Sequence, residues 1–357
     1  MTVANLPHSV LVTGGAGYIG SHCVRRLLDD GFAVVVVDNL YSGNRWAVPE
    51  SVPFMECSAG DSIQIAEIIR KHRVDAVLHF AGHIVVPESV RDPLKYYANN
   101  TCVSRNLIQL CLDGGVGSFI FSSSAAVYGQ PRQIPVPESA ELAPVNPYGT
   151  SKLATEWMLR DVAAASRQSI KPARADVDFR YVALRYFNVA GAHADGTIGQ
   201  ATPQATHLIK VAAQAACGLR PRVSIFGTDY QTRDGTCVRD YIHIDDLIEA
   251  HVLALKHLRR GGPSAVFNVG YGEGYTVREV LGAMRDVAGG PLEIVEAQRR
   301  SGDAAVLIAD STAIRRDLEW TPRHNDIRFI CESAVKWERK LLSMRRREGS
   351  DGCRSSQ

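Results

Sequence analysis

Residues 9–20, with the sequence Ser-Val-Leu-Val-Thr-Gly-Gly-Ala-Gly-Tyr-Ile-Gly, decide the fold. The apolar run at 9–13 predicts a buried strand, and Gly14, Gly17 and Gly20 follow it. Glycines at these positions permit a tight turn, a close approach of the backbone to a pyrophosphate and close packing of the next helix. The free N–H groups at the start of that helix can bind phosphate oxygens. Alone, such a triplet is also compatible with a merely structural turn.

The second predicted strand supports the nucleotide-binding interpretation. It is the apolar run at 33–38, and it ends on Asp38, 18 positions after Gly20. A carboxylate in this place can accept hydrogen bonds from an adenosine ribose and repels a 2′-phosphate. The pattern therefore predicts NAD rather than NADP as the cofactor. The alternative role for Asp38 is a helix or turn cap.

Strands and helices alternate along the first half of the chain. Each of the predicted helices at 63–71, 94–111 and 147–165 is followed by a predicted strand, at 76–80, 119–121 and 181–185 respectively. This alternation predicts an α/β fold with a Rossmann-type, doubly wound parallel sheet. After residue 188 the regularity gives way to glycine-rich loops, which predicts a smaller mixed α/β domain for the substrate. We expect domains at 1–190 and 191–343, with segments of the second returning to the first, a peripheral insertion at 167–178 and a frayed tail at 344–357.

Composition excludes several classes of function. The 357 residues carry a net charge of +2, which gives no support to nucleic-acid or membrane binding. The eight cysteines include no C-x-x-C pair, so we expect reduced thiols, a cytoplasmic protein and no metal site. No apolar run approaches the ~20 residues of a membrane helix.

A tyrosine and a lysine four residues apart are the candidate catalytic pair. Tyr148 and Lys152 lie on one face of the helix predicted at 147–165. The ordinary pKa of tyrosine is about 10, and a nearby lysine and a cationic nicotinamide would lower it toward that of a useful base. Ser124 follows the strand at 119–121, and strand ends carry the sites of such sheets.

These motifs together resemble the extended short-chain dehydrogenase/reductase family of NAD-dependent epimerases and dehydratases. Within it, the chain is similar to the UDP-glucose (UDP-galactose) 4-epimerases over almost its whole length. The strings that carry the resemblance are TGGAGYIGSH (13–22), HFAG (79–82), SSSAAVYG (122–129), NPYGTSK (146–152), LRYFN (184–188) and DGTCVRDYIH (234–243).

The resemblance implies a set of site residues. Ser124, Tyr148 and Lys152 would form the catalytic set and also contact the cofactor. The other residues implied for NAD are Gly14, Gly17, Tyr18, Ile19, Gly20, Asp38, Asn39, Ser42, Asp61, Ser62, Phe80, Ala81, Gly82, Asn99 and Phe187. The residues implied for the UDP-sugar, besides Ser124 and Tyr148, are Asn188, His207, Ile225, Phe226, Arg239, Arg300, Asp303 and Leu307.

The implied reaction is reversible C4 epimerisation of UDP-glucose and UDP-galactose through a 4-keto sugar, with tightly bound NAD as the hydride shuttle. The family also implies a homodimer. A bulky Leu307 would favour hexoses over their N-acetyl analogues, unless it faces the core. The alternatives are an epimerase of UDP-N-acetylhexosamines or UDP-pentoses, a dehydrogenase, and an inactive NAD-binding protein. A dehydratase is disfavoured because Ala125 and Ala126 stand where those relatives carry an acid pair.

Overall fold

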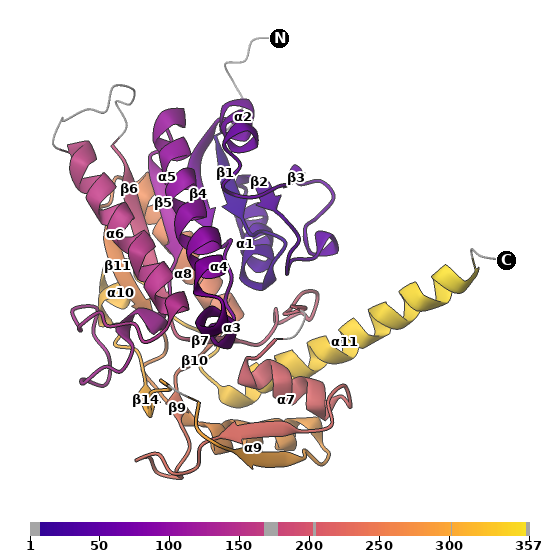
Figure 1. The fold of residues 1–357 in the computed structure, drawn as a ribbon. Coiled ribbons are helices and arrows are strands. Elements are labelled where there is room, and N and C mark those ends of the chain that lie inside the picture. Colours follow the sequence, from indigo (N-terminus) through magenta and orange to yellow (C-terminus); the bar gives the residue numbers. More distant parts are fainter. Residues whose placement is uncertain (1–7, 168–177, 203–204, 301, 355–357) are drawn as a thin grey trace.

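A seven-stranded parallel sheet forms the core of the protein (Figure 1). The computed structural model describes residues 8–167, 178–202, 205–300 and 302–354. The strands lie in the order β3-β2-β1-β4-β5-β6-β11, and every pairing is parallel. They are β1 (Ser9–Thr13), β2 (Ala33–Asp38), β3 (Phe54–Glu56), β4 (Val74–His79), β5 (Ser118–Ser122), β6 (Arg180–Tyr186) and β11 (Ala265–Val269). The predicted α/β fold with a doubly wound sheet is confirmed.

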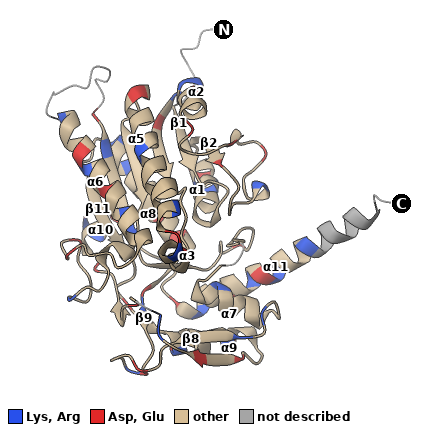
Figure 2. Ribbon diagram, viewed as in Figure 1, with Lys and Arg blue, Asp and Glu red and all other residues tan. Residues whose placement is uncertain are grey.

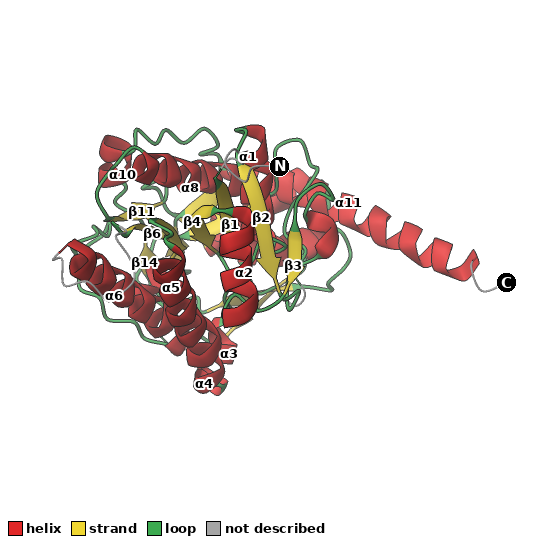
Figure 3. Cartoon of the chain, turned by 90° about the horizontal axis from the view of Figure 1, so that it is seen from above, coloured by secondary structure: helices red, strands yellow, loops and turns green. Residues whose placement is uncertain are grey.

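Helices cover both faces of this sheet (Figure 3). Val10 and Val12 of β1 pack on the side of α1 (Tyr18–Asp29) and α8 (Ile244–Arg259). Leu11 packs on the opposite side, which α2 (Ser62–His72), α5 (Val103–Gly114) and α6 (Pro147–Arg167) cover. Because successive strand residues face opposite sides, a sheet covered twice needs apolar residues at every position. All five residues of β1 are accordingly buried.

Short helices connect or flank these layers. They are η2 (Arg45–Ala47), α3 (Val86–Arg91), α4 (Pro93–Tyr96), the π-helix η3 (Tyr97–Cys102), η4 (Ala125–Tyr128) and α10 (Thr312–Asp317). Although α8, α10 and β11 follow residue 190, they pack on or extend the large sheet.

The remaining elements form a smaller mixed α/β part at one end of the sheet (Figure 1). Its three small sheets are β10-β7, β12-β9-β14 and β13-β8. The strands are β7 (Asn188–Ala190), β8 (Val223–Phe226), β9 (Val238–Arg239), β10 (Tyr241–His243), β12 (Tyr275–Thr276), β13 (Ile294–Ala297) and β14 (Val306–Leu307). The helices are α7 (Leu208–Ala216), α9 (Val277–Ala288) and α11 (Ile327–Arg354). A capping box of Thr276 and Glu279 begins α9, which buries Val280, Leu281 and Met284.

The C-terminal segment differs from the sequence prediction. Where a frayed tail was expected from residue 344, α11 continues to Arg354 and projects from the body of the protein (Figure 3). The residues at 344–348 are Met, Arg and Glu, which have high intrinsic helix propensity, so they can extend a helix that packing has already nucleated. The run Gly-Ser-Asp-Gly at 349–352 has low helix propensity, and propensity does not explain its helical conformation. The predicted insertion at 167–178 lies, apart from its two ends, outside the described residues.

Charges are dispersed over the ribbon. Figure 2 shows basic and acidic residues interspersed along the helices of both parts. In the part of the chain that the structure describes, no helix combines the length and apolar character needed to cross a membrane.

Candidate active site

A cavity of about 1320 Å³ lies where the parallel strands end and the smaller part meets the sheet. The strand order reverses between β1 and β4, and doubly wound sheets bind nucleotides in the crevice at such a point. Typical ligand sites of roughly 300–1,000 Å³ hold one drug-sized molecule. This cavity is therefore large enough for more than one nucleotide-sized ligand.

The glycine loop forms one wall of the cavity. Gly14 has a φ of +70°, and a Cβ on it would lie 2.6 Å from the backbone nitrogen of Ala81. Only glycine fits this position, because a side chain would collide with the loop after β4. Gly17 caps α1 without a side-chain hydrogen bond. The first N–H groups of α1 therefore lack a side-chain acceptor, which suits a pyrophosphate.

Asp38 stands beside this loop at the end of β2. Its carboxylate accepts hydrogen bonds from the backbone nitrogens of Ala16 at 2.9 Å and Leu40 at 2.8 Å. Burial raises the pKa of Asp38, while these backbone donors lower it. The carboxylate also lines the cavity, where it can accept from ribose hydroxyls and repel a phosphate. The uncapped helix and this carboxylate together fit NAD.

Three candidate catalytic side chains lie close together in the cavity. They stand between the half beside the glycine loop and the half formed by the smaller part of the protein. Tyr148 and Lys152 lie one turn apart near the start of α6 and are 7% and 4% exposed. Lys152 Nζ donates to the carbonyl of Ser122 at 2.8 Å and lies 4.9 Å from the ring centre of Phe121. Ser124 precedes η4, where its hydroxyl accepts from the backbone nitrogen of Ala126 at 3.2 Å. Tyr148, Lys152 and Ser124 all line the cavity.

Burial dominates the titration of the candidate catalytic pair. It lowers the pKa of Lys152 to about 8, against the opposing negative charge of Glu156. It raises the pKa of Tyr148, while a hydrogen bond with Ser124 opposes the increase. We expected Lys152 to lower the pKa of Tyr148. In the protein alone, burial of the phenol dominates the pKa of Tyr148, and the Lys152 ammonium group donates to the carbonyl of Ser122.

The far half of the cavity carries the residues expected to hold the sugar nucleotide. Arg239 of β9 forms an ion pair with Asp303. The Arg300 guanidinium lies 3.8 Å from the ring centre of Phe226. Arginine suits a diphosphate because its planar guanidinium pairs with two oxygens at once. Asn188, His207 and Leu307 complete the expected set on this wall.

Comparisons with known proteins place the chain in a family. Residues 10–270 match the model of the NAD dependent epimerase/dehydratase family. The chain belongs to the NAD dependent epimerase/dehydratase family. This membership confirms the predicted family and the predicted dependence on NAD.

Individual epimerases of the family match nearly the whole chain. The chain is 52% identical to the UDP-glucose 4-epimerase of Azospirillum brasilense, over 96% of this chain and 95% of that protein. The structure of the Brucella ovis UDP-glucose 4-epimerase in complex with NAD has a TM-score of 0.86 and 40% identity, over 92% and 98% of the two chains. The UDP-Glc/GlcNAc 4-epimerase of Campylobacter jejuni has a TM-score of 0.80 and 46% identity, over 94% and 100%.

Three residues implied by the resemblance to this epimerase family are not among the described residues that line the cavity, and their contacts with ligands stay predictions. The side chain of Asp61 accepts from the backbone nitrogens of Ile63 and Gln64 and caps α2. Asp61 and its neighbour Ser62 are not among the described residues that line the cavity. Ile225 is 1% exposed in the core, because β8 alternates and turns Ser224 and Phe226 to the cavity instead. All other implied site residues line it.

The structure adds lining residues that the sequence did not single out. They are next to expected ones in sequence or in the sheet, and include Ser122, Tyr186, Leu208, Ser224, Tyr241 and Val277. Ser122, Tyr186 and Tyr241 lie within the quoted motifs, whereas Leu208, Ser224 and Val277 lie outside them and had no signal in the sequence. Which of these neighbours faces the cavity depends on strand alternation and helix phase.

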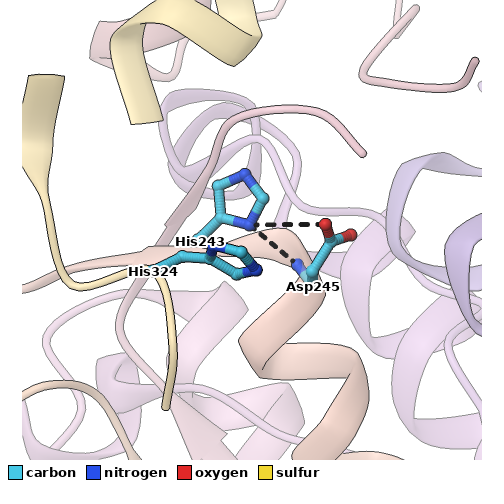
Figure 4. A group of neighbouring side chains, drawn as sticks. All are labelled: His243, Asp245 and His324. Atoms are coloured by element: carbon cyan, nitrogen blue, oxygen red, sulfur yellow. Dashed lines mark hydrogen bonds and ion pairs between the residues drawn. The ribbon is translucent and has the colours of Figure 1, made fainter. Parts of the chain in front are cut away.

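Outside the cavity, His243, Asp245 and His324 bring potential metal-ligating atoms within 4.8 Å of one another (Figure 4). The Nδ1 atom of His243 already accepts from the backbone nitrogen of Asp245 at 3.2 Å and so caps α8. His324 stacks on Phe329 with ring centres 4.9 Å apart. A helix cap and an aromatic stack account for this cluster, and we assign no metal to it.

Proposed function

We propose that the protein inverts the C4 configuration of a UDP-hexose and thereby interconverts UDP-glucose and UDP-galactose. The observation that carries the proposal is the meeting of Ser124, Tyr148 and Lys152 between a nucleotide-binding sheet and an arginine-bearing wall. One half of the cavity fits NAD, and the other offers cations to a second nucleotide. The names and structures of the relatives support the same reaction.

The proposed proton transfer uses Tyr148. Its Oη, as phenolate, takes the proton of the sugar 4-hydroxyl and later returns it, while the Ser124 hydroxyl orients the same oxygen. Lys152 contributes positive charge that favours the phenolate. The chemistry that NAD supplies when bound is reversible hydride transfer at C4 of the sugar. Because the same atom is oxidised and then reduced, the cofactor is unchanged after each cycle.

The proposed role of the far wall is to hold the nucleotide while the sugar turns. Arg239 and Arg300 would bind the diphosphate, and Phe226 and Asn188 would flank the rest of the UDP-sugar. A fixed diphosphate lets a released keto sugar rotate about its bond to the phosphate. Either face of its ring can then meet the cofactor.

Leu307 supports hexoses as the preferred substrates. It lines the cavity from β14 and packs against the small cluster that contains Ala125 and Phe187. A bulky apolar side chain leaves less room for a 2-acetamido group and cannot donate a hydrogen bond to it. UDP-N-acetylhexosamines are the second candidate class, because the Campylobacter jejuni relative is a UDP-Glc/GlcNAc 4-epimerase.

The proposed function is tested by incubating the purified protein with UDP-galactose and no added NAD, followed by analysis of the nucleotide sugars. We expect UDP-glucose without net accumulation of NADH. Stoichiometric NADH with a ketose or uronate product would instead identify a dehydrogenase. A 4-keto-6-deoxy product would identify a dehydratase.

We also propose a division into domains at 1–190 and 191–343, with α8, α10 and β11 of the second span returning to pack on or extend the sheet of the first. The proposal further includes a homodimer and a cytoplasmic location. Leu94 of α4 and Trp157 of α6 support the homodimer, because they expose 76% and 46% of their area on neighbouring helices. Exposed apolar side chains that lie together favour association. Light scattering coupled to gel filtration measures the mass directly.

A further inference from the structure

A buried carboxylate beneath the candidate catalytic pair takes no part in the proton transfer described above. Glu156 lies on α6 four residues after Lys152 and eight after Tyr148, so the three share one helix face. It is only 4% exposed. A buried carboxylate is costly unless it is paired and hydrogen-bonded, so its partners show what it is for.

Glu156 has two partners, and they come from neighbouring strands. Arg185 of β6 donates from Nε to both carboxylate oxygens, at 3.0 and 3.1 Å, and from Nη2 to Oε2 at 2.6 Å. Ser123, the residue after β5, donates its hydroxyl to Oε1 at 2.5 Å. The carboxylate therefore joins α6 to the ends of β5 and β6.

The bond to Ser123 acts on the catalytic set because Ser123 lies between two of its contacts. The carbonyl of Ser122 accepts from Lys152, and the hydroxyl of Ser124 faces the cavity. The backbone nitrogen of Ser123 donates to the carbonyl of Leu184 at 2.9 Å. With its backbone and its side chain both held, Ser123 fixes the short segment that aligns the lysine and the serine.

We propose that Glu156 is a positioning residue for the epimerisation, holding the strand end at 122–124 in register with Tyr148 and Lys152 on α6. This inference rests on the proposed function. Glu156 itself does not line the cavity, and it acts through Ser123 and through its charge.

The charge of Glu156 has a separate consequence for Lys152. Burial alone favours the neutral amine, and the Glu156 carboxylate favours the ammonium form that stabilises the tyrosine phenolate. The other titratable groups around Lys152 and Glu156 include Tyr148 on α6, His79 on β4, Tyr128 on η4, and Tyr181, Arg185 and Tyr186 on β6. Burial lowers the pKa of His79 to about 3, so it is neutral at physiological pH. Glu156 is therefore the acidic group of this set.

Two variants separate the positional effect from the electrostatic one. Ser123→Ala removes the hydrogen bond and keeps the carboxylate. We expect kcat to fall about tenfold with KM within about twofold and the pH profile unmoved, since one misaligned contact weakens only the transition state. Glu156→Gln keeps an acceptor for Ser123 and removes the charge. We expect the alkaline limb of kcat to move to lower pH by about one unit, because Lys152 then loses its proton more easily.

Glu138→Gln is the matched control. Its carboxylate accepts from the backbone nitrogen of Asn268 at 2.8 Å, and its carbonyl accepts from Arg185, so it belongs to the same network without touching Ser123. We expect wild-type kcat and pH profile from it. The amount of NAD(H) released on denaturation and the melting temperature are measured for every variant.

The outcomes distinguish this proposal from the proposed function. A wild type that does not epimerise UDP-galactose contradicts the function itself. An active wild type whose folded Ser123→Ala and Glu156→Gln variants keep the wild-type kcat and pH profile contradicts the role of Glu156. If these variants have a lower melting temperature and an unchanged kcat, the network serves stability alone, and the proposed positioning role of Glu156 is also contradicted. If Glu156→Gln fails to fold, Ser123→Ala alone decides.

Discussion

The two halves of the cavity are built in different ways. In the half that fits NAD, the glycine loop and Asp38 come from one continuous stretch, in which β1, the loop, α1 and β2 follow one another, and the loops after β4 and β5 complete the wall. The sugar half is assembled from Asn188, Phe226, Arg239, Arg300 and Leu307, which lie on short strands and loops of three different small sheets or between them. A site made by local backbone geometry leaves a spacing signature, whereas a site made by distant side chains leaves only isolated residues. The predictions below test whether the two halves are energetically separate.

Tyr148 lies between the NAD half and the sugar half of the cavity. Its hydroxyl should affect the catalytic step and not the binding of either ligand. We expect Tyr148→Phe to lower kcat about 10³-fold or more, since loss of general acid–base catalysis costs several kcal/mol. Released NAD(H) and binding of UDP should remain at the wild-type level. Tyr181→Phe on β6 is the control, because Tyr181 is buried in the sheet core. A Tyr148→Phe enzyme with near-wild-type kcat would remove Tyr148 as the base.

Arg239 tests the sugar half alone. We expect Arg239→Met to lower kcat/KM for UDP-galactose about 100-fold, because charged hydrogen bonds contribute roughly 1.5–3 kcal/mol each. The amount of bound NAD should not change, since the arginine lies in the other half. Arg233→Met is the matched control. Arg233 pairs with Glu279 on the surface and does not line the cavity. Loss of NAD from the Arg239 variant would show that the halves are coupled.

Leu307 tests the size of the sugar pocket. We expect Leu307→Ser to raise kcat/KM for UDP-N-acetylglucosamine relative to UDP-glucose by about 30-fold, or about 2 kcal/mol of relieved steric exclusion. Val306→Ser is the control, because Val306 is the neighbouring residue of β14 and does not line the cavity. Equal wild-type rates on both substrate classes would refute the selection by Leu307.

Asp38 tests the cofactor half. We expect Asp38→Asn to release a mixture of NAD(H) and NADP(H) on denaturation, where the wild type releases NAD(H). Removing the charge repulsion shifts the ratio of the affinities for NADP(H) and NAD(H) by about tenfold, or about 1.4 kcal/mol, in favour of NADP(H). Asp29→Asn on the exposed end of α1 is the control. NADP(H) as the main nucleotide of the wild type would show that Asp38 does not face the ribose.

The implied residues that do not line the cavity belong to both halves, since Asp61 and Ser62 are implied for NAD and Ile225 for the UDP-sugar. The 9–20 stretch predicted its strand, its turn and its helix, because the requirement for glycine is local there: a Cβ on Gly20 would collide with the carbonyl group of Gly14. Arg239, Arg300 and Asp303, which the resemblance implies for the UDP-sugar, line the cavity. Ile225 is buried in β8, where a shift of one position along a strand reverses the side that a residue faces. Asp61, implied for the adenine, caps α2 and does not line the cavity, and its contact with the cofactor stays a prediction.

By itself the sequence determined the parallel sheet and the dependence on NAD, because both follow from spacings along strands, turns and helices, and it singled out Tyr148 and Lys152 as the candidate catalytic pair. Only the tertiary structure decided the environment of that pair. Burial raises the pKa of Tyr148 and lowers that of Lys152. The contacts of Glu156 with Ser123 and Arg185 join α6 to the ends of β5 and β6. Desolvation and such contacts depend on which segments pack together in space, and no local pattern along the chain records that.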